Sequence, residues 1–157
     1  MEETSARRTY SDCRMTRQAS LITADDSTFS ISGKLNVIGI YATDITIPTD
    51  PMIASQLVFL FIVEADPSDP YQKLDLRIDL PSGDFRQVPV NLTTLRAGEA
   101  DKIRWSLKFP LLFQNAILKP GPIVATAIHE KGVLQPAAPV IVLRPPFPGP
   151  AIQPPNQ

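Results

Sequence analysis

Cysteine and histidine are almost absent from this sequence: of its 157 residues, one is cysteine (Cys13) and one is histidine (His129). A single cysteine excludes an internal disulfide, which indicates a reducing compartment and leads us to expect a cytoplasmic protein. Two such ligands cannot complete a structural zinc site, which needs about four. His129 stands alone before the turn sequence Glu130-Lys131-Gly132, as is typical of a solvent-exposed side chain. We therefore expect no cofactor and no catalysis by a Cys–His or Ser–His pair.

The sequence also has no excess charge of either sign, because 15 basic and 16 acidic residues leave a net charge of −1. Such a balance gives no field to attract nucleic acid or an anionic membrane, so neither is expected as a partner. Long apolar runs are missing too, since Leu57–Val63 is far too short to cross a bilayer. Polar residues follow Arg7-Arg8, where an export signal would need an apolar stretch.

What the sequence does contain is strand-like alternation, which Lys73–Leu80 shows most clearly. Its apolar residues would face a core and its charged residues would face water. Pro81-Ser82-Gly83-Asp84 follows as a turn, and Phe85–Leu92 alternates again, as expected for an antiparallel hairpin. Similar segments recur about every ten residues, without a long helical period. The pattern predicts an all-β fold, an antiparallel β-sandwich of about eight strands that is immunoglobulin-like or C2-like in general architecture.

The alternation also predicts the individual strands and their buried faces. The predicted strands cover residues 21–24, 33–41, 44–47, 55–65, 71–80, 85–92, 102–109, 123–129 and 140–143. Residues 111–118 follow Pro110 and are expected to form a short helical or irregular turn. The side chains predicted to face the core are Leu35, Val37, Phe59, Phe61, Leu74, Leu76, Ile78, Val88, Val90, Ile103, Trp105, Leu107, Ile123 and Ala125.

Composition divides the chain into three parts. Residues 1–18 are polar, rich in Ser, Thr and Arg, and predicted to be disordered. Residues 19–144 hold most of the apolar residues and form the predicted sandwich domain. Residues 145–157 contain six prolines, which lack the N–H donor that a sheet interior requires. We expect this tail to be extended and polyproline-like.

One predicted strand departs from alternation, because residues 57–63 are apolar on both faces. A two-layer sandwich needs only one apolar face per strand. Two explanations remain open. A loop or a terminal segment covers the outer face, or that face is a self-association or partner surface with Val58, Leu60 and Ile62 as its contact residues.

Carboxylates are the only side chains that could hold a metal ion. Asp25 and Asp26 lie in one predicted loop, and Asp66 and Asp69 lie in another. Calcium takes several oxygen ligands, which a sandwich can gather from loops at one end. The spacing matches no EF-hand pattern, however, and acidic turn residues are mostly solvated. A calcium site therefore stays the alternative, and the sequence assigns no metal ligand.

The segments Gly33–Tyr41, Ile47-Pro48, 57–63 and 74–83 together resemble a bacterial family known as a domain of unknown function, of the DUF6941 type. The shared pattern is a Gly-Lys-Leu opening, a proline break, a long apolar strand and an alternating strand that ends in a glycine-containing turn. The resemblance covers about residues 20–143. It implies a small β-sandwich and a bacterial source, and it brings no catalytic residues.

These observations predict a non-enzymatic interaction or structural module rather than an enzyme. The expected partner is a protein, either a second copy that associates through the apolar strand or a different chain. The alternative is a sandwich that binds a ligand or calcium at an acidic site formed by loops.

Overall fold

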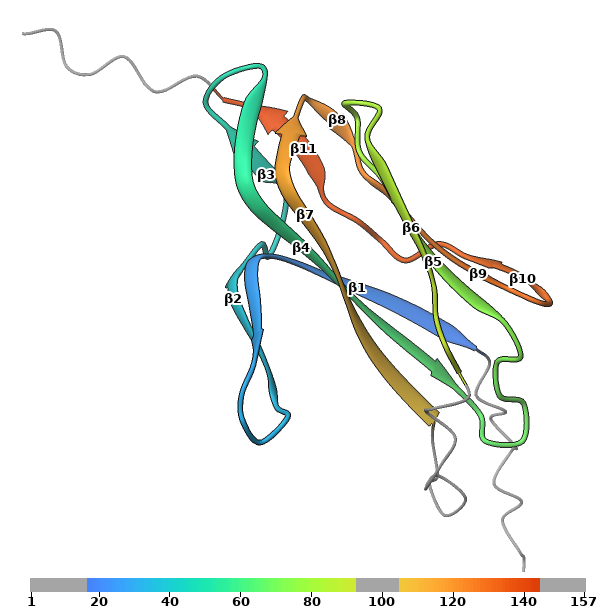
Figure 1. Cartoon of the computed structure of the whole chain (residues 1–157). Coiled ribbons are helices and arrows are strands. Elements are labelled where there is room, and N and C mark those ends of the chain that lie inside the picture. Colours follow the sequence, from blue (N-terminus) through green and yellow to red (C-terminus); the bar gives the residue numbers. More distant parts are fainter. Residues whose placement is uncertain (1–16, 93–104, 145–157) are drawn as a thin grey trace, which may run out of the picture.

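The computed structural model describes residues 17–92 and 105–144, which form strands packed in two layers (Figure 1). Neither described range contains a helix. The predicted all-β sandwich is therefore confirmed. Of the predicted terminal segments, 1–18 and 145–157, only Arg17 and Gln18 are described, and Gln18 already begins the first strand.

The first layer is a four-stranded antiparallel sheet with the order β2-β1-β4-β7. Its strands are β1 (Gln18–Phe29), β2 (Leu35–Ile40), β4 (Met52–Ala65) and β7 (Trp105–Leu118). β1 pairs with β4 from Gln18 opposite Glu64 to Ala24 opposite Val58, and then continues into a hairpin with β2. β4 and β7 pair along their full lengths and form the centre of this layer.

The second layer contains two sets of strands that continue one another. One set has the order β10-β9-β5-β6 and the other the order β3-β11-β8. Their strands are β3 (Ile45–Ile47), β5 (Leu74–Asp79), β6 (Phe85–Pro89), β8 (Gly121–Pro122), β9 (Val124–His129), β10 (Gly132–Leu134) and β11 (Val140–Leu143). Ile123 joins β8 to β9 and donates its N–H to the carbonyl of Pro139 at 3.4 Å. β8–β9 and β10–β11 are therefore the two sides of one long, interrupted hairpin.

The strand order is that of an immunoglobulin-like sandwich. β1, β4 and β7 occupy the places of strands A, B and E, while β5, β6 and β9 occupy those of C, C′ and F. β10 and β11 together form strand G. β3 pairs parallel with β11, so the chain crosses from the first layer to the second between β1 and β3. The β1–β2 hairpin is thus an insertion at this crossing.

The core lies between the layers and consists mainly of alternating side chains from β4, β5 and β7. The fully buried members on β4 and β5 are Leu57, Phe59, Phe61, Val63, Leu74, Leu76 and Ile78. Phe59 and Phe113 meet edge to face with their ring centroids 5.5 Å apart, which favours both apolar burial and ring electrostatics. The alternation along β5 thus predicted its buried face correctly.

Leu35 and Val37 are the predicted core residues that the structure places elsewhere. Both are half-buried, but they lie on β2, which pairs only with β1 outside the sandwich. The sequence pattern could not show this, because an apolar face is equally apolar on a hairpin that leaves the sheet. The predicted core residue Ile103 lies outside the described residues.

The prediction of a helical or irregular turn at 111–118 is wrong, because these residues form the second half of β7. Pro110 does not end the strand, since β7 lies at a sheet edge, where a missing N–H is tolerated. Asn115 has a φ of 52°, which asparagine tolerates better than most residues. Gln114 and Asn115 are both exposed at this kink, and Ala116 then returns to the core.

Two glycines shape the β1–β2 hairpin. Gly39 has a φ of 68°, and any side chain there would collide with the carboxylate of Asp25. Gly33, with a φ of 75°, ends the turn between the strands and donates its N–H to the carbonyl of Ser30 at 2.8 Å. Ser30 in turn donates its N–H to the carbonyl of Lys34 at 2.8 Å, which closes a hairpin with a three-residue loop.

We predict that Leu76→Asp abolishes cooperative unfolding, because Leu76 is fully buried and an unpaired carboxylate in a core costs several kcal/mol. Denaturation followed by circular dichroism measures this effect. Gln87→Asp, on the exposed strand β6, is the matched control and should unfold like the wild type. A Leu76→Asp protein with the wild-type midpoint would contradict the assigned core face.

Candidate functional site

The outer face of β4, which carries the predicted contact residues Val58, Leu60 and Ile62, is largely covered. Val58 and Leu60 are 0% and 3% exposed, and Ile62 is half-buried. Residues of the β1–β2 hairpin lie beside Leu60 and Ile62. The sequence leaves two explanations open, a covered face or an exposed contact surface. Val58 and Leu60 fit the first, and part of the cover is a hairpin rather than the expected loop or terminal segment.

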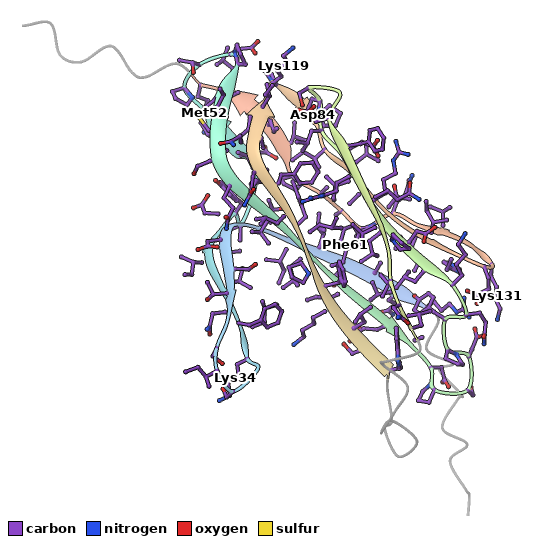
Figure 2. All side chains as sticks on the ribbon, viewed as in Figure 1. Lys34, Met52, Phe61, Asp84, Lys119 and Lys131 are labelled. Carbon is purple, nitrogen blue, oxygen red and sulfur yellow. The ribbon has the colours of Figure 1, made fainter. Side chains whose placement is uncertain are left out.

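A groove of about 680 Å³ remains between the hairpin and the outer face of the first layer. Apolar side chains from both sides line it: Ile22, Phe29, Leu35, Val37, Leu60 and Ile62. Lys34 and Lys108 also line the groove and bring positive charge to it. Lys34 lies at the tip of the hairpin, far from the sandwich (Figure 2).

The hairpin itself exposes large apolar side chains. Phe29 is 65% exposed and Ile31, in the turn, is fully exposed. On β2, Ile38 and Ile40 are 56% and 57% exposed. Ile38 lies opposite Asp26 on β1, and the alternation of a strand places it on the face opposite Val37 and the groove. The hairpin therefore presents apolar residues on both of its faces and at its tip.

Asp25 and Asp26 lie at the base of this hairpin, within β1 rather than in the predicted loop. The hydroxyl of Tyr41 donates to Asp25 at 2.5 Å, and burial together with this bond raises the pKa of Tyr41 to about 12. Asp26 accepts from the backbone N–H of Ser27 at 2.6 Å and from the side-chain amide of Gln56. Both carboxylates thus brace the corner at which β1 leaves β4.

Asp66 and Asp69 lie in the turn after β4 and have different partners. Asp66 accepts from the N–H and hydroxyl of Ser68 at 2.8 and 2.6 Å. Asp69 accepts from Arg17 at 3.1 Å and from Lys131 at 2.5 Å. The structure therefore does not bring together the four acidic residues considered for calcium. Within residues 17–92 and 105–144, no group of three or more His, Cys, Asp or Glu is placed to hold a metal ion.

Arg17 forms a polar cluster with Asp69, Tyr71, His129 and Glu130, and we call this set the Arg17 cluster. Its guanidinium side chain is only 7% exposed. It donates to Glu130 at 2.6 Å and to the carbonyl of Pro70 at 2.9 Å, and it lies 4.6 Å from the ring centroid of Tyr71. The cluster ties the start of β1 to the turn after β4 and to the β9–β10 turn.

The electrostatics of the Arg17 cluster favour charged Glu130 and neutral His129. Burial alone would raise the pKa of Glu130, but hydrogen bonds from Arg17 and from the N–H groups of Lys73 and Gln72 outweigh it and lower that pKa to about 2. Burial and the nearby Arg17 charge lower the pKa of His129. Arg17 lies 2.9 Å from Nδ1 of His129, which is the acceptor when Arg17 donates.

The sequence did not reveal the Arg17 cluster. The partners of Arg17 lie between 52 and 113 residues further along the chain, so no local pattern marks them. His129 was expected to be an exposed turn residue, yet it is half-buried and held between Arg17 and the ring of Tyr71. The one local feature that points to a polar cluster here is the adjacent acidic and basic pair Glu130-Lys131, which follows His129 in the turn.

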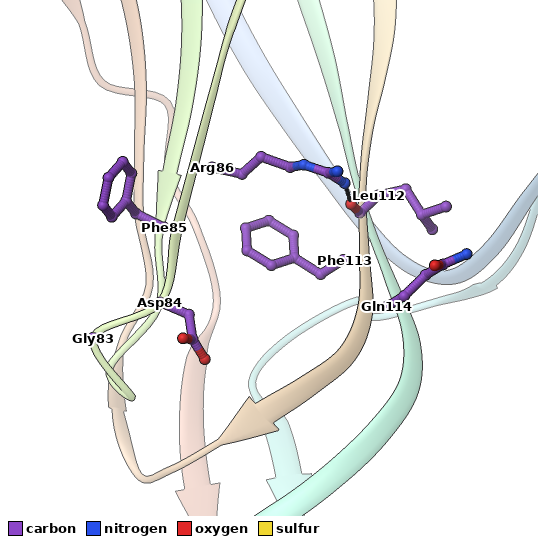
Figure 3. A pocket seen from close by; sticks show the side chains of 7 residues that line it. All are labelled: Gly83, Asp84, Phe85, Arg86, Leu112, Phe113 and Gln114. Carbon is purple, nitrogen blue, oxygen red and sulfur yellow. Dashed lines mark hydrogen bonds between the residues drawn. The ribbon is translucent and has the colours of Figure 1, made fainter.

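A second hollow of about 680 Å³ opens between β6 and β7, which are edge strands of the two layers (Figure 3). Arg86 reaches across it from β6 and donates to the backbone carbonyl of Leu112 on β7. Phe113 and Asp84 also line the hollow. Of its charged groups, Arg86 thus joins the two sheet edges, whereas Asp84 accepts from the hydroxyl of Ser82 at 3.0 Å within the β5–β6 turn.

Comparison of the chain with protein-family models, with curated proteins and with solved structures gave no match. The resemblance to the DUF6941 type therefore stays a prediction. The described residues also contain no helix long and apolar enough to cross a membrane.

We predict that the free energy of unfolding falls in two steps on acidification. Because the pKa of His129 is lowered in the fold, its contribution is present above the ordinary value of about 6.5 and is lost as pH falls below it. Glu130 contributes above its ordinary pKa of about 4.5, and this contribution is lost as pH falls toward 2.

Urea denaturation at a series of pH values measures both steps. Glu130→Gln should remove most of the lower step and His129→Gln the upper one, while each leaves the other in place. The assigned electrostatics would be wrong if Glu130→Gln had the same dependence on pH as the wild type below about pH 4.5.

Proposed function

We propose that this protein is a non-enzymatic interaction module that self-associates, with the β1–β2 hairpin as its contact element. The sandwich is the scaffold in this proposal, and the hairpin, which projects from it at the point where the chain crosses between the layers, carries the recognition surface. The proposal shifts the predicted contact from the outer face of β4 to the element that lies over it.

The observation that carries the proposal is the concentration of exposed apolar side chains on the hairpin. Phe29, Ile31, Ile38 and Ile40 are four of the eleven large apolar residues with high exposure, and they fall within twelve consecutive residues. The other seven are spread over six other strands. Single exposed apolar residues are normal on a surface, whereas a contiguous group usually marks a contact site.

The chemistry of the described polar groups supports a binding role over catalysis. Glu130, Asp69 and His129, which have shifted pKa values, are held in the Arg17 cluster by ion pairs and hydrogen bonds. The groove beside the hairpin is lined mainly by apolar side chains, with Lys34 and Lys108 as its charged members. Neither place combines a free nucleophile with a general base, which enzymatic acyl or phosphoryl transfer would need.

Light scattering coupled to size exclusion tests the proposal on the full chain. We expect the apparent mass to rise above that of a monomer as the concentration increases from about 5 to 500 μM, the range in which small interfaces associate. Ile38→Lys should keep the chain monomeric over this range, because it places a charge in the contact surface.

Val133→Lys is the matched control, because Val133 on β10 is 55% exposed and lies outside the hairpin. It should associate like the wild type. A wild-type chain that stays monomeric at every concentration would contradict the proposed function. Equal effects of Ile38→Lys and Val133→Lys would contradict the role of the hairpin.

A further inference from the structure

We propose that β2 pairs edge to edge with β2 of a second copy, antiparallel across a two-fold axis, so that the two hairpins join into a four-stranded sheet. This inference rests on the proposed function and adds its partner and its geometry. It follows from which sheet edges the structure leaves open and from the directions of the backbone groups along β2.

β2 is the least protected of the strands that end a sheet in the described part of the chain. Natural sheets block their edges with charged residues, prolines, bulges or very short strands. β7 carries Lys108 and Pro110, and Arg86 occupies its Leu112 carbonyl. β6 contains Arg86 and Pro89, and β3, β8 and β10 have three residues or fewer.

β2 has none of these protections over Leu35–Val37, and its six residues include no charge and no proline. Gly39, with its left-handed φ, ends the regular part of the strand. Beyond Ala24, β1 no longer pairs with β4, so the outer part of the hairpin is a two-stranded sheet, and its other edge, on β1, carries the charged Asp25 and Asp26. Two strands alone are marginally stable in water, and additional strands stabilise them.

The hairpin turn determines which backbone groups of β2 are free. Ser30 and Lys34 form the first hydrogen-bonded pair, and such pairs recur at every second residue of an antiparallel ladder. Asn36 opposite Thr28 and Ile38 opposite Asp26 are therefore the next pairs, with their N–H groups directed at β1. The N–H and C=O groups of Leu35 and Val37 consequently point outward from the sheet.

These outward groups select one symmetric register. When Leu35 lies opposite Val37 of the second copy, and Val37 opposite its Leu35, about four interchain hydrogen bonds form around an axis at Asn36. Both residues also line the groove, so their side chains meet on the same face of the joined sheet and extend its apolar surface. In this register, Ile38 is also the pairing partner of Lys34 of the second copy.

The first experiment compares two substitutions at one position by light scattering on the full chain. Val37→Pro removes the outward N–H without touching the bonds to β1, and should weaken association at least about tenfold, because two interchain hydrogen bonds are lost. Val37→Ala removes more side chain but keeps the N–H, and should associate more tightly than Val37→Pro. Circular dichroism and unfolding midpoints check that both variants fold.

The second experiment does not depend on the folding of the proline variant. In a Cys13→Ser background, which removes the one native thiol, Asn36→Cys should form a disulfide-linked dimer under mild oxidation. Residues facing each other at a non-hydrogen-bonded position have Cα atoms about 4.5 Å apart, within the range of a disulfide. Thr28→Cys is the control, since Thr28 is exposed on the same face but lies one strand away from the open edge.

The outcomes separate this inference from the proposed function. Loss of association with Val37→Pro but not Val37→Ala, together with cross-linking at residue 36 but not at 28, supports edge pairing. Association that survives Val37→Pro, without a cross-link at residue 36, overturns edge pairing and leaves self-association standing. A wild-type chain that is monomeric at every concentration, together with no cross-link in the Asn36→Cys variant, overturns both.

Discussion

The burial of β4 on both of its faces is the constraint on which the rest of this structure depends. The inner face is covered by the second layer, as in any sandwich, but the outer face needs a separate cover because Val58 and Leu60 are apolar. The β1–β2 hairpin contributes to that cover from the point where β1 leaves the sheet. The same segment thus helps to bury the apolar outer face of β4 and projects from the sandwich with apolar residues of its own.

The part of β1 that pairs with β4 is secured by different interactions at its two ends. At the start, the Arg17 cluster joins β1 to turns of both layers through charge-assisted bonds to a nearly buried guanidinium. At the corner, Asp25 and Asp26 hold Tyr41 and Gln56, and Gly39 supplies the close approach that a side chain would prevent.

The sequence predicted the layered architecture well, because burial on one face produces alternation that is visible locally, as in Leu74, Leu76 and Ile78. It predicted β7 poorly, because the length of a strand next to a proline depends on whether that proline lies at an edge. It also could not separate the hairpin from the sandwich. Leu35 and Val37 alternate like core residues, and only the pairing partner of β2 distinguishes the two cases.

The candidate site was harder to predict than the fold, since it is made by relations between distant segments. The apolar strand 57–63 indicated that something must cover or contact it, but the hairpin residues beside it lie twenty or more positions earlier. The acidic residues suggested a shared site because both pairs were predicted to lie in loops, and the fold separates them into the hairpin base and the turn after β4. No local pattern contains that information.

The chain enters and leaves the β1–β2 hairpin at neighbouring points, since Tyr41 donates its N–H to the carbonyl of Thr23 at 2.9 Å. Residues added to or removed from both strands near the turn would therefore change the reach of the hairpin without displacing the strands that build the core. Such an insertion can diverge in length and sequence while the scaffold is conserved. Changes confined to the outer part of the hairpin thus come at little cost to folding.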